Sequence, residues 1–222
     1  YTTLSRLYPM DTRHLTLSDK ITLWKKFAPF ALKRPKPPAQ ERVLAGTRHS
    51  KRRDAEAIQH HYDVSNRFYR WVLGPSMAYT CAVFPTVDAS LAVAQEEKFD
   101  LVARKLNLKP GMTLLDVGCG WGGMVMHAVK NYGVQAIGVT LSEQQAIWGQ
   151  DAIKEAGLEG SAQIRLCDYR DVTETDFDAI SSIGLTEHIG RANYPSYFSL
   201  LNDKLKPEGR MLNHTITRPG DT

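Results

Sequence analysis

The chain of 222 residues is 42% hydrophobic and 23% charged, with a formal net charge of +4. These proportions are typical of a globular domain with a core of ordinary size, and they exclude disordered and fibrous proteins. The longest apolar runs fall far short of the roughly 20 residues that a membrane-spanning helix needs. Cys81, Cys119 and Cys167 form no C-x-x-C pair, which argues against a disulfide framework and a structural zinc site. We therefore expect a protein of the reducing cytoplasm.

Residues 1–53 differ in charge from the rest of the chain. They hold 13 Lys or Arg and 3 Asp or Glu, a net charge of +10, whereas the remaining residues carry −6. Residues 17–32 predict a short amphipathic helix interrupted by Pro29, and the Pro-rich stretch that follows predicts a linker. A basic arm with interspersed aromatic residues suits an anionic membrane surface. The alternatives are a solvated linker or a docking arm for a partner chain.

The remaining residues, 54–222, predict one domain. Hydrophobic periodicity predicts helices at residues 56–73 and 90–106, before a turn at Lys109-Pro110-Gly111. Strands and helices then alternate, which implies a parallel sheet covered on both faces. The predicted fold is α/β, with a doubly wound, Rossmann-like sheet. The expected strands are residues 113–117, 135–139, 162–167, 179–184 and 210–215, and the expected helices are 122–131, 142–156 and 194–205, with a short one near Thr173.

The first of these strands ends in the sequence Asp116-Val117-Gly118-Cys119-Gly120-Trp121-Gly122-Gly123. Glycines at a strand end let the backbone approach a ligand closely and turn into a helix. The spacing is not the dinucleotide fingerprint G-x-G-x-x-G, and it contains no phosphate-binding Lys-Ser/Thr. Methyltransferases use such a D-x-G-x-G strand end to hold the amino-acid part of S-adenosylmethionine. This favours a methyltransferase over a structural turn or a nicotinamide site. Because methyltransferase sheets usually have seven strands, we expect the C-terminal strands to be absent from this chain.

Two later segments supply further candidate cofactor contacts. No acidic residue follows the second strand at Thr140, where many α/β domains bind ribose, but Gln144 and Gln145 can bond the hydroxyls. After the third strand, Asp168 can accept a hydrogen bond from the adenine amino group, and Tyr169 can pack on the ring. A helix cap for Asp168 and a core role for Tyr169 are the alternatives.

Six segments carry a further signal because they match one pattern in order: residues 61–69, 78–82, 115–122, 138–142, 184–190 and 214–216. Together they resemble one family, the cyclopropane fatty acid synthases and mycolic acid cyclopropane synthases. The resemblance implies transfer of a methyl group from S-adenosylmethionine to the cis double bond of an unsaturated phospholipid acyl chain. Loss of a proton from the resulting cation then closes a cyclopropane ring. A methylene or methyl-branched product, or a non-catalytic fragment that binds S-adenosylmethionine, are the alternatives.

The resemblance also implies a set of site residues. Cys81, Glu187 and His214 match catalytic residues that surround a bound bicarbonate ion, where a base and a negative field stabilise the cation. Without the resemblance, each residue has a structural alternative: Cys81 as a small hydrophobic residue, Glu187 as a helix cap and His214 as a hydrogen-bonded core histidine. Glu187 and His188 lack a third ligand, so we assign no metal. The implied cofactor contacts, with Asp116 and Asp168 added from the motifs above, are Tyr79, Thr80, Asp116, Gly118, Gly120, Thr140, Gln145, Asp168 and Tyr169.

These interpretations lead to expected partners and a location. We expect a phospholipid or other acyl-chain substrate and a peripheral position on the inner, cytoplasmic face of an anionic membrane. The chain has no N/D-P-P-Y motif for flipped bases and no aromatic-basic interleaving near the glycine loop, so we expect no nucleic-acid partner. The sequence does not decide between a monomer and a homodimer.

Overall fold

The computed structural model describes residues 16–32 and 65–217. The chain divides into two units, Tyr1–Val43 and Leu44–Thr222. The predicted boundary at residue 53 lies outside the described residues. The first unit contains α1 (Leu17–Leu32), as predicted, but Pro29 lies inside the helix and does not interrupt it. Within the described residues, no helix is long and apolar enough to cross a membrane.

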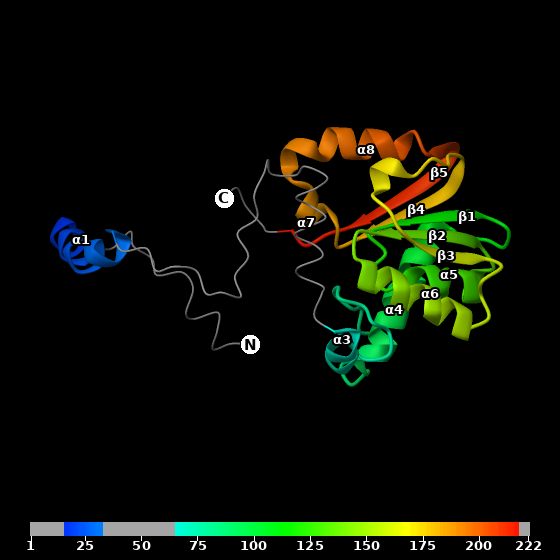
Figure 1. Cartoon of the computed structure of the whole chain (residues 1–222), viewed down its shortest axis with the longest axis horizontal. Helices are drawn as coiled ribbons and strands as arrows, with labels where there is room; N and C mark the ends of the chain where they lie inside the picture. The colour runs from blue at the N-terminus through cyan, green and yellow to red at the C-terminus, as the bar shows by residue number, and fades with distance from the viewer. Residues whose placement is uncertain (1–15, 33–64, 218–222) are drawn as a thin grey trace. The chain divides into compact units, whose positions relative to one another are not determined.

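The second unit is built on a five-stranded sheet (Figure 1). The strand order is β3-β2-β1-β4-β5, and all neighbouring strands pair in parallel. This order, in which the chain moves outward from β1 first to one side and then to the other, defines a doubly wound sheet. The predicted fold class is therefore confirmed. The strands are β1 (Thr113–Val117), β2 (Gln135–Thr140), β3 (Ala162–Leu166), β4 (Phe177–Ile183) and β5 (Leu205–His214).

Helices cover both faces of this sheet, as Figure 1 shows. The helices α4, α5 and α6 lie on one face, and α8 lies on the other. Adjacent residues of a strand point to opposite faces, and the two cores divide in the same way. Leu114 packs in the core under α4 and α5, whereas Leu115 packs in the core under α8. The helices are α3 (Asn66–Leu73), α4 (Leu91–Leu106), α5 (Gly123–Tyr132), α6 (Glu143–Glu155), α7 (Thr186–Ile189) and α8 (Tyr194–Asn202).

The structure corrects several predicted elements. The strand β5 begins at Leu205, five residues before its predicted start, and α8 ends at Asn202. The sequence Lys-Pro-Glu-Gly inside β5 is a turn signal, but it forms an irregularity opposite Phe177–Ala179 at the sheet edge, where proline is tolerated. The short helix predicted near Thr173 is instead a 3₁₀ turn at Tyr169–Asp171. The helix α7 was not predicted. Of the helix predicted at residues 56–73, only α3 lies within the described residues.

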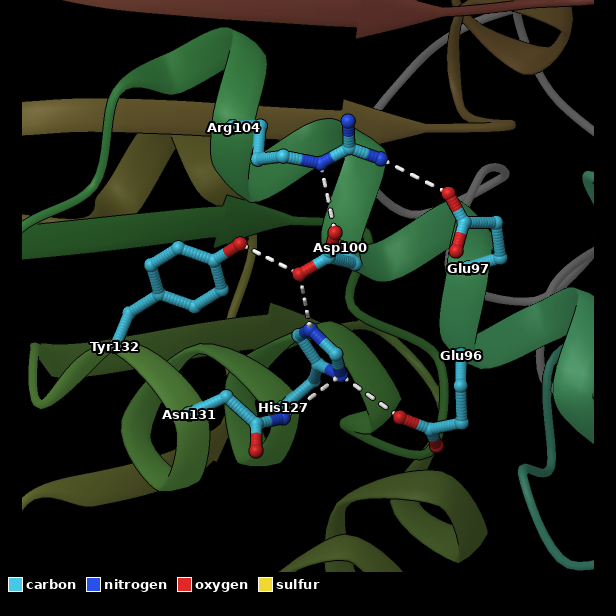
Figure 2. Close-up of polar contacts among 7 residues, drawn as sticks. All are labelled: Glu96, Glu97, Asp100, Arg104, His127, Asn131 and Tyr132. Carbon is cyan, nitrogen blue, oxygen red and sulfur yellow. Dashed lines mark hydrogen bonds and ion pairs between the residues drawn. The ribbon is translucent and has the colours of Figure 1, made fainter.

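A polar cluster fixes α4 against α5 (Figure 2). The Tyr132 hydroxyl donates to Asp100 over 2.6 Å, and the Arg104 guanidinium bridges Asp100 and Glu97. The buried His127 ring lies 2.8 Å from the Glu96 carboxylate. Burial and the hydrogen bond to Asp100 raise the pKa of Tyr132 to about 12. Because this cluster occupies one side of α4, it holds the opposite side towards the carboxyl ends of the strands.

Gly138 in β2 leaves no room for a side chain. A Cβ atom there would lie 2.8 Å from both Cys119 Cβ and Ile164 Cδ1. We predict that Gly138→Ala lowers the free energy of unfolding by about 1–3 kcal/mol, because overpacking forces these neighbours to move. Urea unfolding measures the change. Gly160→Ala, where a Cβ meets nothing within 4 Å, is the matched control and should be nearly neutral. Equal effects of the two substitutions would contradict this account of the packing.

Candidate functional site

A cavity of about 590 Å³ opens at the carboxyl ends of β1, β2 and β4. Its lining includes Asp116 at the end of β1, Thr140 at the end of β2 and Ile183 at the end of β4. The chain leaves β1 towards one face of the sheet and leaves β4 towards the other face. In doubly wound sheets, this divergence opens the crevice in which ligands bind.

The loop after β1 forms one wall of the cavity. Gly118, Gly120 and Gly122 have φ values of 73°, 56° and 85°, in the left-handed region that favours glycine. The backbone N–H groups of Gly118 and Cys119 both donate to the carbonyl oxygen of Val139 over 3.0 Å, which ties the loop to β2. Gly118 and Gly120 line the cavity, as the sequence motif predicts. The loop thus brings bare backbone to the edge of the cavity.

Two opposite charges are buried in the wall of the cavity. The Asp116 carboxylate accepts a hydrogen bond from the Ser181 hydroxyl over 2.6 Å. Lys98, on α4, lines the same cavity and donates to Thr80 Oγ1 over 2.6 Å. Sequence reasoning missed Lys98. Its signal was a lysine one helical turn from both Ala94 and Val102, on the mainly apolar face of the helix that also carries Gln95.

Burial changes the ionisation of both groups. It raises the pKa of Asp116 to about 6, although the hydrogen bond from Ser181 and the charge of Lys98 oppose this. It lowers the pKa of Lys98 to about 8, and the negative field of Asp116 is the largest opposing influence. Each charge therefore makes the burial of the other less costly, but neither cancels the loss of water.

The segment that carries Tyr79 and Thr80 is held in place by α4. The Gln95 amide nitrogen donates to the Thr80 carbonyl over 2.8 Å and lies 3.4 Å from the Ala78 carbonyl. A Cβ atom on Gly184, just after β4, would lie 2.8 Å from the Thr80 methyl group, so this segment packs closely against the end of β4. Both Tyr79 and Thr80 line the cavity, as predicted.

Thr140 and Gln145 are joined at the end of β2. The Thr140 hydroxyl donates to Gln145 Oε1 over 2.7 Å, and both side chains are buried in the cavity lining. Ser142 caps α6 by accepting from the backbone N–H of Gln145. The helix cap therefore positions the Gln145 side chain, and its amide nitrogen is the atom not engaged with Thr140. An amide nitrogen of this kind can donate to a hydroxyl.

Asp168 and Tyr169 occupy different environments. Asp168 does not line the cavity; it caps the 3₁₀ turn and binds the Arg170 guanidinium through both oxygens, at 2.8 and 2.5 Å. Asp168 therefore has the capping role that the sequence analysis gave as an alternative. Its contact with adenine stays a prediction. Tyr169 lines the cavity while its ring packs edge-on against Tyr197, with centroids 5.2 Å apart.

Of the three predicted catalytic residues, only Glu187 lines the cavity. Glu187, on α7, lines the cavity and accepts from the backbone N–H of Ile216 over 2.7 Å. Burial raises the pKa of Glu187, but this hydrogen bond and others outweigh it, and the pKa lies below its ordinary value. His214 ends β5 opposite Ile183, and its buried Nδ1 has no hydrogen-bond partner among the described residues. Cys81 is exposed and does not line the cavity.

Comparison with known proteins places this site in a family. The family model described as mycolic acid cyclopropane synthetase matches residues 49–222. The chain belongs to this family. The matched range contains each predicted site residue described above.

Individual relatives agree with this assignment. A probable fatty acid methyltransferase of Mycobacterium tuberculosis is 62% identical over 82% of this chain and 44% of its own length. The cyclopropane-fatty-acyl-phospholipid synthase of Escherichia coli K12 is 42% identical over 78% of the chain and 45% of its own length. The mycolic acid cyclopropane synthase CmaA1, solved with SAH and CTAB, superposes with a TM-score of 0.68 at 42% identity, covering 72% of this chain and 55% of that one. The chain spans about half the length of these relatives.

The raised pKa of Asp116 makes the stability of the fold depend on pH. A carboxyl whose pKa rises on folding contributes stability that is fully present below the unfolded value of 3.8 and is lost as the pH rises through about 6. We predict that Asp116→Asn raises the free energy of unfolding by roughly 1–3 kcal/mol at neutral pH. The gain should vanish as the pH falls below 3.8, where Asp116 is itself neutral.

Urea unfolding across this pH range measures the effect of Asp116→Asn. The control is Asp151→Asn, at an exposed position of α6, which should leave stability unchanged at every pH. A loss of stability in Asp116→Asn at neutral pH would mean that the attraction between Asp116 and Lys98 exceeds the cost of burying the carboxylate.

Proposed function

We propose that this protein transfers a methyl group from S-adenosylmethionine to the cis double bond of an unsaturated acyl chain in a phospholipid, forming a cyclopropane ring. The observation that carries the proposal is the cavity at the ends of β1 and β4, lined by the motifs of the mycolic acid cyclopropane synthetase family. A methylene or methyl-branched fatty acid is the second candidate product. The relative at 62% identity is named a probable fatty acid methyltransferase, and this name supports a methylated product as the second candidate.

The residues of the cavity fit S-adenosylmethionine. The bare backbone of Gly118 and Gly120 allows close approach of an amino-acid chain, and the buried Asp116 carboxylate attracts its ammonium group. The Gln145 amide nitrogen suits the ribose hydroxyls, and Tyr79 and Tyr169 offer aromatic surfaces to the remainder. A relative at 42% identity was solved with S-adenosylhomocysteine (SAH), the product that remains after methyl transfer. When bound, the cofactor supplies an electrophilic methyl group.

The far side of the cavity suits an acyl chain and proton removal. Ile183, Leu185 and Ile189 give this wall an apolar surface, and Glu187 lies among them. An ionised Glu187 supplies a negative field where positive charge develops on the acyl chain. His214, Ile216 and Cys81 lie outside the cavity lining. The Nδ1 of His214 has no hydrogen-bond partner among the described residues and suits a small anion such as bicarbonate, whereas the Ile216 N–H already donates to Glu187. The relative solved with CTAB, a detergent with a single long alkyl chain, supports an acyl substrate.

Transfer of isotope label tests the proposal. Cells that express the protein are fed methyl-labelled methionine, and their phospholipid fatty acids are analysed by mass spectrometry. A cyclopropane acyl chain that carries the label is the expected product, whereas a labelled methylene or branched chain selects the second candidate. The absence of label in lipid, together with retained SAH binding, would leave only a non-catalytic S-adenosylmethionine-binding protein.

Substitution of Glu187 separates catalysis from cofactor binding. Gln keeps the shape of the side chain and can still accept from Ile216, but it removes the negative charge. We predict that Glu187→Gln lowers turnover by about 10²- to 10³-fold, because the field acts on the transition state, and leaves SAH affinity unchanged. Lipid product yield and calorimetry with SAH measure the two effects. Near-normal turnover with a lowered melting temperature would assign Glu187 a structural role only.

Membrane association follows from the same proposal, and α1 is the segment we assign to it. Within the first unit, the side chains of Leu17, Trp24 and Phe27 are exposed on this helix beside Lys25 and Lys26. Each basic residue near an anionic surface contributes roughly 1 kcal/mol. Apolar and cationic groups presented together suit an anionic lipid headgroup layer.

Charge reversal in α1 tests this assignment. Lys25→Glu with Lys26→Glu should weaken binding to phosphatidylglycerol vesicles by about tenfold or more, and salt at about 1 M should weaken wild-type binding. Vesicle co-sedimentation measures both. The control with the same change in net charge is Lys105→Glu with Lys109→Glu, at exposed positions in the second unit. Equal binding of wild type to neutral vesicles would refute the electrostatic mechanism.

A further inference from the structure

We propose that Lys98 binds the α-carboxylate of the amino-acid part of S-adenosylmethionine, and that Thr80 shares this carboxylate with it. The inference rests on the proposed function and assigns a residue to one end of its cofactor. Lys98 lies on α4, outside the glycine loop and outside the segments that the sequence motifs single out.

The environment of Lys98 calls for an anion. Only 2% of its surface is exposed, and burying an ammonium group is costly unless an anion or several acceptors surround it. The group has three N–H donors, yet among the described residues Thr80 Oγ1 is its one hydrogen-bond acceptor, at 2.6 Å. The Nζ atom also lies 4.2 Å from the centre of the Phe99 ring. The remaining donors suit a ligand in the cavity that Lys98 lines.

The described cavity lining contains one other lysine or arginine side chain, Arg170, and its surroundings differ from those of Lys98. Arg170 is held by both oxygens of Asp168 and already has a carboxylate. Within the described part of the chain, Lys98 has no carboxylate within ion-pair distance, although the field of Asp116 reaches it. An incoming carboxylate therefore gains more from Lys98 than from Arg170.

The two buried charges match the two charges of an α-amino acid. Its ammonium and carboxylate groups are attached to the same carbon atom, and Asp116 and Lys98 present an anion and a cation to the same cavity. Thr80 adds a second donor: its oxygen accepts from Lys98, so its own O–H is oriented away and can donate to a carboxylate oxygen. Gln95, one turn earlier on α4, fixes the Thr80 backbone. One helix thus sets the positions of both donors.

Calorimetry with two ligands tests this assignment. SAH carries the carboxylate, and its decarboxylated analogue, 5′-deoxy-5′-(3-aminopropylthio)adenosine, keeps the ammonium and adenosine but lacks it. The full wild-type chain should bind SAH about 10- to 100-fold more tightly than the analogue, as expected for a charge-assisted contact. In Lys98→Met this preference should disappear, because SAH affinity falls while affinity for the analogue stays the same. Lys105→Met, at an exposed position of α4, should keep the full preference.

The outcomes separate this inference from the proposed function. If Lys98→Met weakens both ligands equally, Lys98 only supports the fold of the pocket, and the assignment is overturned. Wild-type affinities that are equal for the two ligands would overturn it too, without reliance on the folding of a variant. If the wild-type chain binds neither ligand, the proposed function itself fails.

Discussion

The parallel pairing of β1 with β2 on one side and with β4 on the other determines where this protein can bind a ligand. Because the chain leaves β1 and β4 towards opposite faces of the sheet, the loop at Gly118–Gly122 and the segment at Gly184–Ile189 diverge. The cavity lies between them, and every wall of it is attached to a strand end or to a helix packed on the sheet. The rigid sheet therefore fixes the site, and the loops supply its chemistry.

The cavity is built from groups that do not favour folding. Asp116 and Lys98 lose water when they are buried, and their mutual attraction and the Ser181 and Thr80 hydroxyls offset only part of that loss. The φ values of the glycine loop are accessible at little cost only to residues without a Cβ atom. The apolar cores on the two faces of the sheet supply the compensating stability. A site of this kind is expected to gain stability when a ligand of complementary charge binds, since the ligand restores the lost interactions.

The helix α4 connects the stability of the fold to the geometry of the site. One side carries the charged cluster that fixes it to His127 and Tyr132 of α5, and another side carries Gln95 and Lys98 towards the cavity. The segment 78–80 is attached to the site through α4, and its contact with Gly184 ties it to β4. Residues far apart in sequence thus meet around the cavity because α4 holds a defined rotation about its own axis.

The sequence by itself determined the α/β class and the existence of the five strands, and nine of the twelve candidate site residues line the cavity. Those features depend on local signals: period-two and helical hydrophobic patterns, the D-x-G-x-G strand end and the family motifs around Thr80, Thr140 and Glu187. Only the tertiary structure revealed Lys98, which shares a mainly apolar helix face with Gln95. The fold brings it within hydrogen-bond distance of Thr80 and into the field of Asp116. Asp168 is a different case, because its cap contact is with Arg170, two residues away, and its adenine contact stays a prediction. Local patterns specify backbone conformation, whereas the partners of a buried charge depend on which strands and helices pack together.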